Sequence, residues 1–280
     1  MILVTGSKGQ LGTMLKPLLA EAIFVDVDEL DICDAAAVRG FVKARGVTAV
    51  VNCAAYTAVD AAEDDAEVAE RVNVLGVRNL AEAVGKIVHI STDYVFDGTA
   101  QRPYSEEDAP SPTSVYGVTK LRGEQAALEA GQTVAVIRTS WLYSPYGKNF
   151  FKTMLRLGAE RESISVVSDQ VGSPTYAGDF AGAIVAVLRG MTEGSREIYH
   201  YSNEGVCSWC DFASEIMRQA KLPCRVLPIA TVDYPTKARR PAYSVLSKEK
   251  IKRDFGLTVP DWCDGLARCF AACEKNSDKT

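Results

Sequence analysis

Short apolar stretches alternate with helical patterns along the first half of the chain, and this alternation limits the folds that are possible. Five stretches are predicted to be strands, at residues 1–5, 22–27, 49–53, 86–90 and 134–138. The segments between them are predicted to be helices, at residues 10–20, 35–45, 60–84 and 114–130. Apolar strands joined by helices are typical of a parallel sheet that is covered on both faces. We therefore predict an α/β protein.

A glycine-rich loop, Gly6-Ser7-Lys8-Gly9-Gln10-Leu11-Gly12, follows the first strand. Glycines allow a tight turn and a close backbone approach to a pyrophosphate, and the helix that follows favours an anion at its N-terminus. The spacing is Gly-x-x-Gly-x-x-Gly rather than Gly-x-Gly-x-x-Gly, so the prediction depends on the position of the loop after the first strand. The residues predicted to bind a dinucleotide here are Gly6, Gly9, Gln10, Leu11 and Gly12.

The pattern changes after residue 145, where shorter elements and proline-containing connections begin. The predicted fold class is a Rossmann-type, doubly wound parallel sheet with a smaller C-terminal substrate-binding lobe. The dinucleotide-binding domain is assigned residues 1–145 together with roughly 176–190. The smaller substrate-binding lobe is assigned roughly 146–175 and 191–280.

Two charged residues give opposite indications about the cofactor. Asp26 is predicted to close the second strand, 20 residues after Gly6, where an acid bonds a ribose hydroxyl and disfavours a 2′-phosphate. Lys8 in the glycine loop would instead attract that phosphate. The choice between NADH and NADPH therefore stays open. Asp31 and Ile32 lie just beyond and are expected to flank the adenine.

Small residues follow the third predicted strand, where a parallel sheet binds its ligands. Small side chains there leave room for a cofactor, although tight core packing would require the same residue types. The residues predicted to line the cofactor site at this strand end are Ala54, Ala55, Tyr56 and Thr57.

Tyr116 and Lys120 are four residues apart, so on a helix they share one face. The pKa of a free tyrosine, about 10, is too high for easy proton exchange near neutral pH, and a nearby ammonium favours the phenolate. Together the two side chains form an acid/base pair suited to a carbonyl or an alcohol. The pair alone is also compatible with a solvated helix face, but its combination with the glycine loop favours catalysis.

Composition argues against several other classes of protein. The chain of 280 residues has a formal net charge of −5, which argues against a nucleic acid partner. No apolar run approaches the roughly 18 residues that a membrane-spanning helix needs. Met1 is followed directly by a predicted strand rather than by a basic leader, so a cytoplasmic location is expected.

The cysteines and histidines give no strong indication of a metal site. The eight cysteines are expected to be reduced. Cys207 and Cys210 match a Cys-x-x-Cys pattern, but no second pair completes a zinc site, and Ser208 is a plausible helix N-cap. His89 and His200, the only histidines, lie near predicted strands. No metal ligand is predicted.

The fourth predicted strand leads into STDYVFDG at residues 91–98, where the Thr92 hydroxyl is placed to hold a substrate carbonyl oxygen, unless it only caps the strand. With this segment the chain resembles the extended short-chain dehydrogenases/reductases, and within them the family of dTDP-4-dehydrorhamnose reductases. The other matching segments are the glycine loop, NCAAYTAVDAAE at 52–63, YGVTK at 116–120, RTSWLY at 138–143, NFFKTMLRL at 149–157, DQVGSPT at 169–175 and ARRP at 238–241.

The resemblance implies a reaction and a set of roles. The reaction is the NAD(P)H-dependent reduction of the C4 keto group of dTDP-4-dehydro-6-deoxy-L-mannose to dTDP-L-rhamnose. The implied catalytic residues are Thr92, Tyr116 and Lys120, of which Tyr116 and Lys120 also contact the cofactor. The implied substrate contacts are Thr92, Asp93, Tyr94 and Trp141. Arg239 and Arg240 are left out of the predicted site, because an exposed loop would carry them equally well.

One departure from the family and two alternatives remain. Some members bind Mg²⁺ through glutamates, one of them just after the glycine loop, but residues 12–15 read Gly-Thr-Met-Leu and contain no acid. We therefore expect a monomer or a homodimer, but not a dimer that is bridged by a metal ion. The alternatives are another nucleotide-sugar reductase, epimerase or dehydratase of the superfamily, and a non-catalytic regulatory subunit like that of methionine adenosyltransferase.

Overall fold

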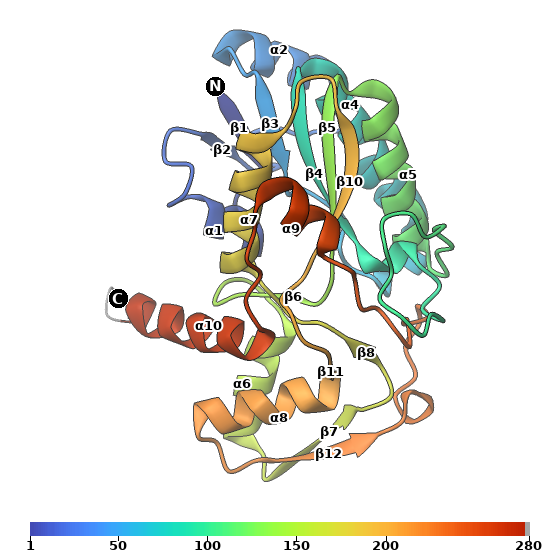
Figure 1. Ribbon diagram of the computed structural model, residues 1–280, viewed down its shortest axis with the longest axis vertical. Helices are drawn as coiled ribbons and strands as arrows, with labels where there is room; N and C mark the ends of the chain where they lie inside the picture. Colours follow the sequence, from blue (N-terminus) through green and yellow to red (C-terminus); the bar gives the residue numbers. More distant parts are fainter. Residues whose placement is uncertain (278–280) are drawn as a thin grey trace.

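The computed structural model of the protein describes residues 1–277, with side chains described through residue 274. A six-stranded parallel sheet forms its larger part (Figure 1). The strands are β1 (Ile2–Thr5), β2 (Ile23–Val25), β3 (Ala49–Asn52), β4 (Lys86–Thr92), β5 (Thr133–Thr139) and β10 (Arg196–Tyr201). Their order in the sheet is β10-β5-β4-β3-β1-β2. The predicted doubly wound α/β fold is confirmed.

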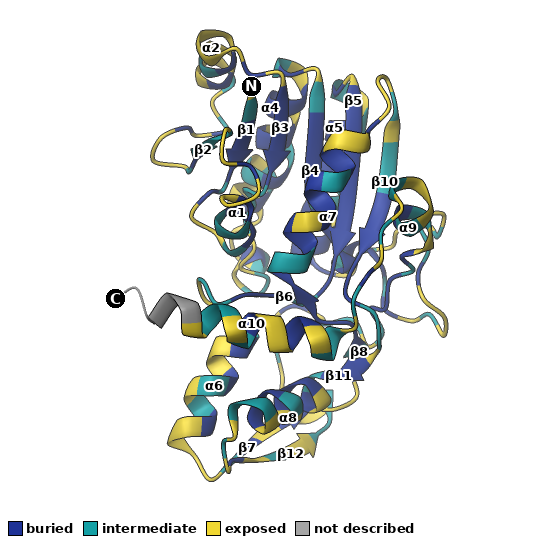
Figure 2. Cartoon of the chain, turned by 60° about the vertical axis from the view of Figure 1, so that its left-hand side comes forward, coloured by how far each residue is buried: buried dark blue, intermediate teal, exposed yellow. Residues whose placement is uncertain are grey.

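Helices cover both faces of this sheet, as continuous apolar strands require. One face packs against α1 (Gln10–Leu15), α7 (Ala177–Gly190) and α9 (Glu249–Phe255). The other packs against α2 (Ala35–Arg45), α4 (Gly76–Ala83) and α5 (Val115–Ala130). Successive strand residues point to opposite faces, so Val4 and Val51 belong to the first core while Leu3 and Val50 belong to the second. Figure 2 shows the central strands of the sheet mainly in the colour of buried residues, and every residue of β3 and β5 is buried.

The strand order reverses between β1 and β3, which lie side by side in the sheet. From β1 the chain continues outward to β2, and from β3 it continues in the other direction to β4 and β5. Loops that diverge from such a point leave a crevice outside the carboxyl ends of the strands, where ligands bind in this class of fold.

A smaller lobe lies below these carboxyl ends (Figure 1). Its helices are α6 (Phe150–Glu160), α8 (Trp209–Ala220) and α10 (Trp262–Ser277). Its strand pairs are β7 (Ser163–Val167) with β12 (Arg225–Ile229), β8 (Val171–Gly172) with β11 (Cys207–Ser208), and β6 (Leu142–Tyr143) with β9 (Thr175–Tyr176). Tyr143, Phe151 and Phe212 lie at the centre of its core. No helix within residues 1–277 is long and apolar enough to cross a membrane.

Two segments lie in a different part of the fold from the one predicted for them. The sequence assigns residues 191–280 to the smaller lobe, but β10 within that range pairs in parallel with β5 over its whole length, and α9 packs on one face of the large sheet. A strand that completes the large sheet belongs with it. The rest of the predicted domain division stays a prediction.

Two helix predictions are corrected by the structure. The helix expected at 10–20 ends at Leu15, because Pro17 has no N–H to continue the ladder. The single helix expected at 60–84 is divided into η1 (Ala61–Glu63), α3 (Ala66–Glu70), the π-turn η2 (Arg71–Leu75) and α4. The remaining short helices are η3 (Asp93–Val95) and η4 (Thr231–Asp233).

Candidate active site

A cleft of about 990 Å³ lies at the carboxyl ends of the strands, between the sheet and the smaller lobe. Every residue predicted from the sequence to contact cofactor or substrate lines it. From the cofactor side these are Gly6, Gly9, Gln10, Leu11, Gly12, Asp31, Ile32, Ala54, Ala55, Tyr56 and Thr57. From the reaction side they are Thr92, Asp93, Tyr94, Tyr116, Lys120 and Trp141. The structure thus brings both predicted groups to one cavity.

The glycine loop has no space for side chains at two of its positions. Gly6 has a φ of +65°, and a Cβ placed there would lie 2.7 Å from the backbone nitrogen of Ala54. A Cβ on Gly12 would lie 2.4 Å from the Gly6 carbonyl oxygen. The loop therefore exposes bare backbone beside the end of β3. Such a cradle fits the close approach of a dinucleotide pyrophosphate.

Asn73, in the π-turn η2, fixes the loop after β3 and was missed by the sequence analysis. Its Oδ1 accepts from the Tyr56 N–H at 2.9 Å, and its Nδ2 donates to the Tyr56 carbonyl oxygen at 3.2 Å. The same Nδ2 donates to the Thr119 hydroxyl on α5 at 3.1 Å. One buried side chain therefore links the cofactor loop to the helix that carries Tyr116. π-Turns are frequent at functional sites, but their position depends on these distant partners.

Asp26 and Lys8 are both engaged within the loops. The Asp26 carboxylate accepts from the Lys8 backbone N–H at 2.9 Å and from the Val27 N–H at 2.9 Å. The Lys8 ammonium pairs with Asp28 at 2.6 Å, and both side chains are largely exposed. Lys8 is therefore paired with a carboxylate of the neighbouring loop.

Tyr116 and Lys120 share the face of α5 that points into the cleft. The helix begins after Ser114, whose hydroxyl accepts from the Gly117 N–H at 3.2 Å. Burial raises the pKa of Tyr116 well above its usual range, and a hydrogen bond with the Thr92 hydroxyl lowers it in part. Tyr116 is thus a protonated phenol near neutral pH, and it hydrogen-bonds the Thr92 hydroxyl.

Lys120 is almost fully buried, with 2% of its surface exposed. Its Nζ donates to the Ile90 carbonyl oxygen at 2.6 Å. Burial lowers the pKa of Lys120 to about 8, and the carboxylate of Glu124 one turn further along the helix opposes that shift. The expected lowering of the Tyr116 pKa by Lys120 is not found, because the effect of burial dominates.

Asp93 is a buried carboxyl next to Thr92. Its Oδ1 accepts from the Thr92 hydroxyl at 2.9 Å, while its Oδ2 has no hydrogen-bond partner among the described residues. The Ser244 hydroxyl faces it but donates, at 3.4 Å, to the Val171 carbonyl oxygen. Burial raises the pKa of Asp93 to about 7, and hydrogen bonds, first that from Thr92, lower it in part. The carboxyl therefore takes up or loses a proton near neutral pH.

This raised pKa predicts a pH-dependent effect of Asp93→Asn on stability. The folded protein holds the Asp93 proton more tightly than the unfolded chain, so the stabilisation is complete below the ordinary pKa of 3.8 and is lost as pH rises toward 7. Asparagine does not titrate. From pH 5 to pH 8 the variant should gain roughly 2–3 kcal/mol relative to the parent, as measured by urea unfolding. If the free energies of unfolding of variant and parent instead change in parallel from pH 5 to pH 8, the Asp93 carboxyl is charged over that whole range.

Trp141 lines the cleft in a strained conformation, with a φ of +50°. Its ring stacks on Trp209 with centroids 3.6 Å apart and an interplanar angle of 10°. A Cβ on Gly172 would lie 2.7 Å from the Trp141 ring. Trp209, at the start of α8, also lines the cleft and was not predicted. The two indoles form an aromatic wall that the smaller lobe contributes to the site.

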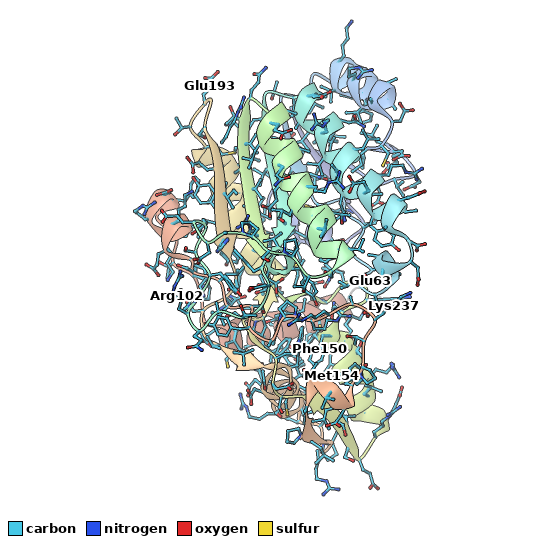
Figure 3. The ribbon with its side chains drawn as sticks, turned by 90° about the vertical axis from the view of Figure 1, so that its right-hand side faces the viewer. Glu63, Arg102, Phe150, Met154, Glu193 and Lys237 are labelled. Carbon is cyan, nitrogen blue, oxygen red and sulfur yellow. The ribbon has the colours of Figure 1, made fainter. Side chains whose placement is uncertain are left out.

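Arg240 also belongs to the cleft, although it was left out of the predicted site. Its guanidinium donates to the Tyr94 hydroxyl at 2.8 Å and to Asp60 at 2.5 Å. Arg239 is exposed and does not line the cavity. The same loop forms an ion pair between Lys237 and Asp64. Figure 3 shows Lys237 next to Glu63 at this edge of the molecule.

The Cys207-Cys210 motif has a structural role. Ser208 caps α8 and forms a capping box with Asp211, as expected for a loop that enters a helix. Both cysteines are free thiols. Within the part of the chain that the structure describes, no three His, Cys, Asp or Glu side chains gather as a metal site would require.

Comparison with known proteins identifies the family. A family model described as the RmlD substrate binding domain matches residues 1–275. The chain belongs to the RmlD family. One family member, the dTDP-4-dehydrorhamnose reductase of Aggregatibacter actinomycetemcomitans, is 40% identical to the chain, and the match covers 98% of this chain and 99% of that protein. The resemblance inferred from the motifs is confirmed.

Two further relatives carry printed names that mention a cofactor or a different sugar. The dTDP-4-dehydrorhamnose reductase of Bacillus anthracis, solved in complex with NADP, has a TM-score of 0.92 and 40% identity, covering 97% of this chain and 98% of that one. A probable dTDP-4,6-dihydroxy-2-methyloxan-3-one 4-ketoreductase of Streptomyces antibioticus is 41% identical, covering 96% and 94% of the two chains. RmlD relatives of similar identity thus carry names with different sugars.

Proposed function

We propose that this protein is an NAD(P)H-dependent oxidoreductase that reduces the C4 keto group of dTDP-4-dehydro-6-deoxy-L-mannose to give dTDP-L-rhamnose. The observation that carries the proposal is one cleft that holds both the glycine loop and the group of Thr92, Tyr116 and Lys120. The names of the RmlD relatives supply the sugar. The expectation of a cytoplasmic monomer or homodimer stays a prediction.

The nicotinamide supplies a hydride when bound, and the protein handles the charge that develops on the substrate oxygen. Tyr116 donates its phenolic proton to the oxygen at C4. Thr92, which hydrogen-bonds Tyr116, holds that same oxygen and aligns the proton transfer. The Lys120 ammonium lies on the same helix face and stabilises the phenolate left on Tyr116. The buried site makes these interactions stronger than they would be in water.

The substrate side of the cleft suits a sugar nucleotide. The indole of Trp141 provides an apolar wall of the cleft that Thr92 also lines, and the Tyr94 hydroxyl accepts from Arg240 at 2.8 Å. We assign Thr92, Asp93, Tyr94 and Trp141 to the sugar. We assign the half-buried guanidinium of Arg240, which also lines the cleft, to the diphosphate, with which it would replace its Asp60 partner.

The Lys8–Asp28 pair predicts how the choice of cofactor can be shifted. Asp28→Asn removes the carboxylate from Lys8 and leaves the ammonium free to meet a 2′-phosphate. Because both groups are exposed, the gain is small, and we expect a shift of kcat/KM toward NADPH of about two- to fivefold. Adding Lys8→Ala to Asp28→Asn should remove this shift toward NADPH. An unchanged ratio in both variants would show that Lys8 does not contact the 2′ position.

Oxidation of NADPH and of NADH tests the proposal directly. When the protein is mixed with cofactor and freshly prepared dTDP-4-dehydro-6-deoxy-L-mannose, one equivalent of cofactor should be oxidised for each equivalent of sugar reduced. The ketone in the name of the Streptomyces relative, dTDP-4,6-dihydroxy-2-methyloxan-3-one, provides a comparison substrate. Faster turnover of that ketone would keep the reductase chemistry but replace the sugar. Tight cofactor binding without turnover of either would favour a regulatory subunit.

A further inference from the structure

A chain of buried polar groups runs behind Lys120, across the ends of three neighbouring strands. The side-chain Oδ1 of Asn52 accepts from the Thr5 hydroxyl at 2.7 Å and from the Ala54 N–H at 3.1 Å. Asn52 Nδ2 lies 3.1 Å from Nδ1 of His89. His89 Nε2 in turn lies 3.5 Å from Nζ of Lys120. Asn52 and His89 are fully buried, so no solvent competes for these contacts.

The contacts of Asn52 determine which nitrogen of His89 carries the proton. The backbone N–H of Ala54 can only donate, so the atom of Asn52 that faces it is the oxygen. Asn52 therefore presents its NH₂ group to His89 Nδ1, which must be an acceptor. Burial, helped by the charge of Lys120, lowers the pKa of His89 well below its usual range, so the ring is neutral. A neutral imidazole has one N–H, and here it is on Nε2.

This tautomer places a donor opposite Lys120. The Nε2–H of His89 and an ammonium on Lys120 would both present hydrogens across the 3.5 Å that separates them. An unprotonated amine instead offers a lone pair to the Nε2–H, while one of its own hydrogens still reaches the Ile90 carbonyl oxygen at 2.6 Å. The His89 ring thus favours the amine over the ammonium and limits where Nζ can lie.

The other ionisable groups around Lys120 act in the opposite direction or are neutral. Glu124 on the same helix and Cys53 after β3 favour the ammonium. Burial raises the pKa of the Cys53 thiol to about 12 and also raises that of Tyr116, so near neutral pH both are uncharged. Glu124 is therefore the charged group that opposes burial, and His89 is the nearest donor that acts with burial.

We propose that His89 is a positioning residue of this active site: its Nε2–H, oriented by Asn52, holds Nζ of Lys120 against the Ile90 carbonyl oxygen and favours the unprotonated amine. The role of Lys120 in the reaction rests on the proposed function. The placement and protonation of Lys120 do not, because they are properties of the protein without substrate.

The tautomer of His89 can be read in the unmodified protein by ¹⁵N NMR of histidine-labelled samples. The sequence has only two histidines, and the second provides an internal control. His200 Nδ1 lies 3.1 Å from the Tyr104 carbonyl oxygen, which can only accept, so His200 must carry its proton on Nδ1. We expect opposite tautomers, Nε2–H for His89 and Nδ1–H for His200. An Nδ1–H tautomer at His89 would overturn the proposal without any variant.

Two amide variants then test the effect on Lys120. His89→Asn keeps an acceptor near Asn52 but has no group at the Nε2 position, whereas His89→Gln can place its NH₂ group there. The titration of Lys120, followed by ¹⁵N NMR of the side chain without cofactor or substrate, should move upward by about one pH unit in His89→Asn, a tenfold change in the ionisation constant. His89→Gln should stay close to the parent.

The outcomes separate this proposal from the proposed function. Equal shifts in the two variants would mean that the imidazole acts only by filling space, and the proposal would fail. A selective shift in His89→Asn, together with no reduction of any sugar ketone, would support the positioning role while contradicting the assigned reaction. If the reaction is as proposed, the basic limb of kcat/KM against pH should move upward with Lys120 in His89→Asn only.

Discussion

Replacing Tyr116 by phenylalanine is expected to lower the rate of hydride transfer by about 10²–10⁴-fold, the usual contribution of a positioned general acid. Phenylalanine fills the same space and keeps the edge-to-face contact with Tyr94, whose ring centroid lies 5.5 Å away. Only the proton and the hydrogen bond with Thr92 are lost. Single-turnover oxidation of NADPH, combined with a direct measurement of cofactor affinity, checks the expectation.

Tyr94→Phe is the matched control, because its hydroxyl contacts Arg240 rather than Thr92. That variant should alter sugar binding more than the rate of the chemical step. If Tyr116→Phe keeps the parental rate while Tyr94→Phe does not, the proton donor has been assigned to the wrong tyrosine.

The largest expected loss of stability follows from Glu124→Ala. Glu124 and Arg138 form an ion pair whose side chains are each only 1% exposed. The guanidinium donates to Glu124 at 2.9 and 2.7 Å, and Ser91 donates to the same carboxylate at 2.5 Å. Removing the acid leaves a buried cation without its partner, which should reduce the free energy of unfolding by about 3–5 kcal/mol. Urea unfolding at neutral pH measures this.

An exposed ion pair provides the comparison. Arg78 and Glu129 lie 3.1 Å apart, with side chains that are 44% and 67% exposed. Glu129→Ala should therefore cost less than about 1 kcal/mol. Similar losses for Glu129→Ala and Glu124→Ala would mean that water reaches the buried pair and that its isolation from solvent is overstated.

The parts of the site that the sequence predicted are those whose cause is local. Tyr116 and Lys120 face the same way because they are four residues apart on a helix that Ser114 caps. Gly6 and Gly12 identify the loop because only a residue without a Cβ fits there. Short-range spacing and steric limits of this kind are written directly in the order of residues.

The parts that the sequence did not predict depend on contacts between distant segments. Arg240 reaches Tyr94 across 146 positions, and nothing near it in the sequence distinguishes it from the exposed Arg239. The sequence predicts one long helix around Asn73, but its hydrogen bonds to Tyr56 accompany a π-turn. The last strand of the large sheet was assigned to the smaller lobe because pairing with β5 is a long-range contact. Tertiary partners, rather than local preference, decide such positions.

The most direct test of the proposed reaction is the position of a transferred label. NADPH that carries deuterium at the reactive position of the nicotinamide should deliver it to C4 of dTDP-4-dehydro-6-deoxy-L-mannose, and NMR of the product should show dTDP-L-rhamnose labelled at C4 only. Tyr116→Phe should form that product far more slowly, with the label at the same carbon. Deuterium at another carbon, or cofactor oxidation without a labelled sugar, would contradict the assignment of this protein as a C4 ketoreductase.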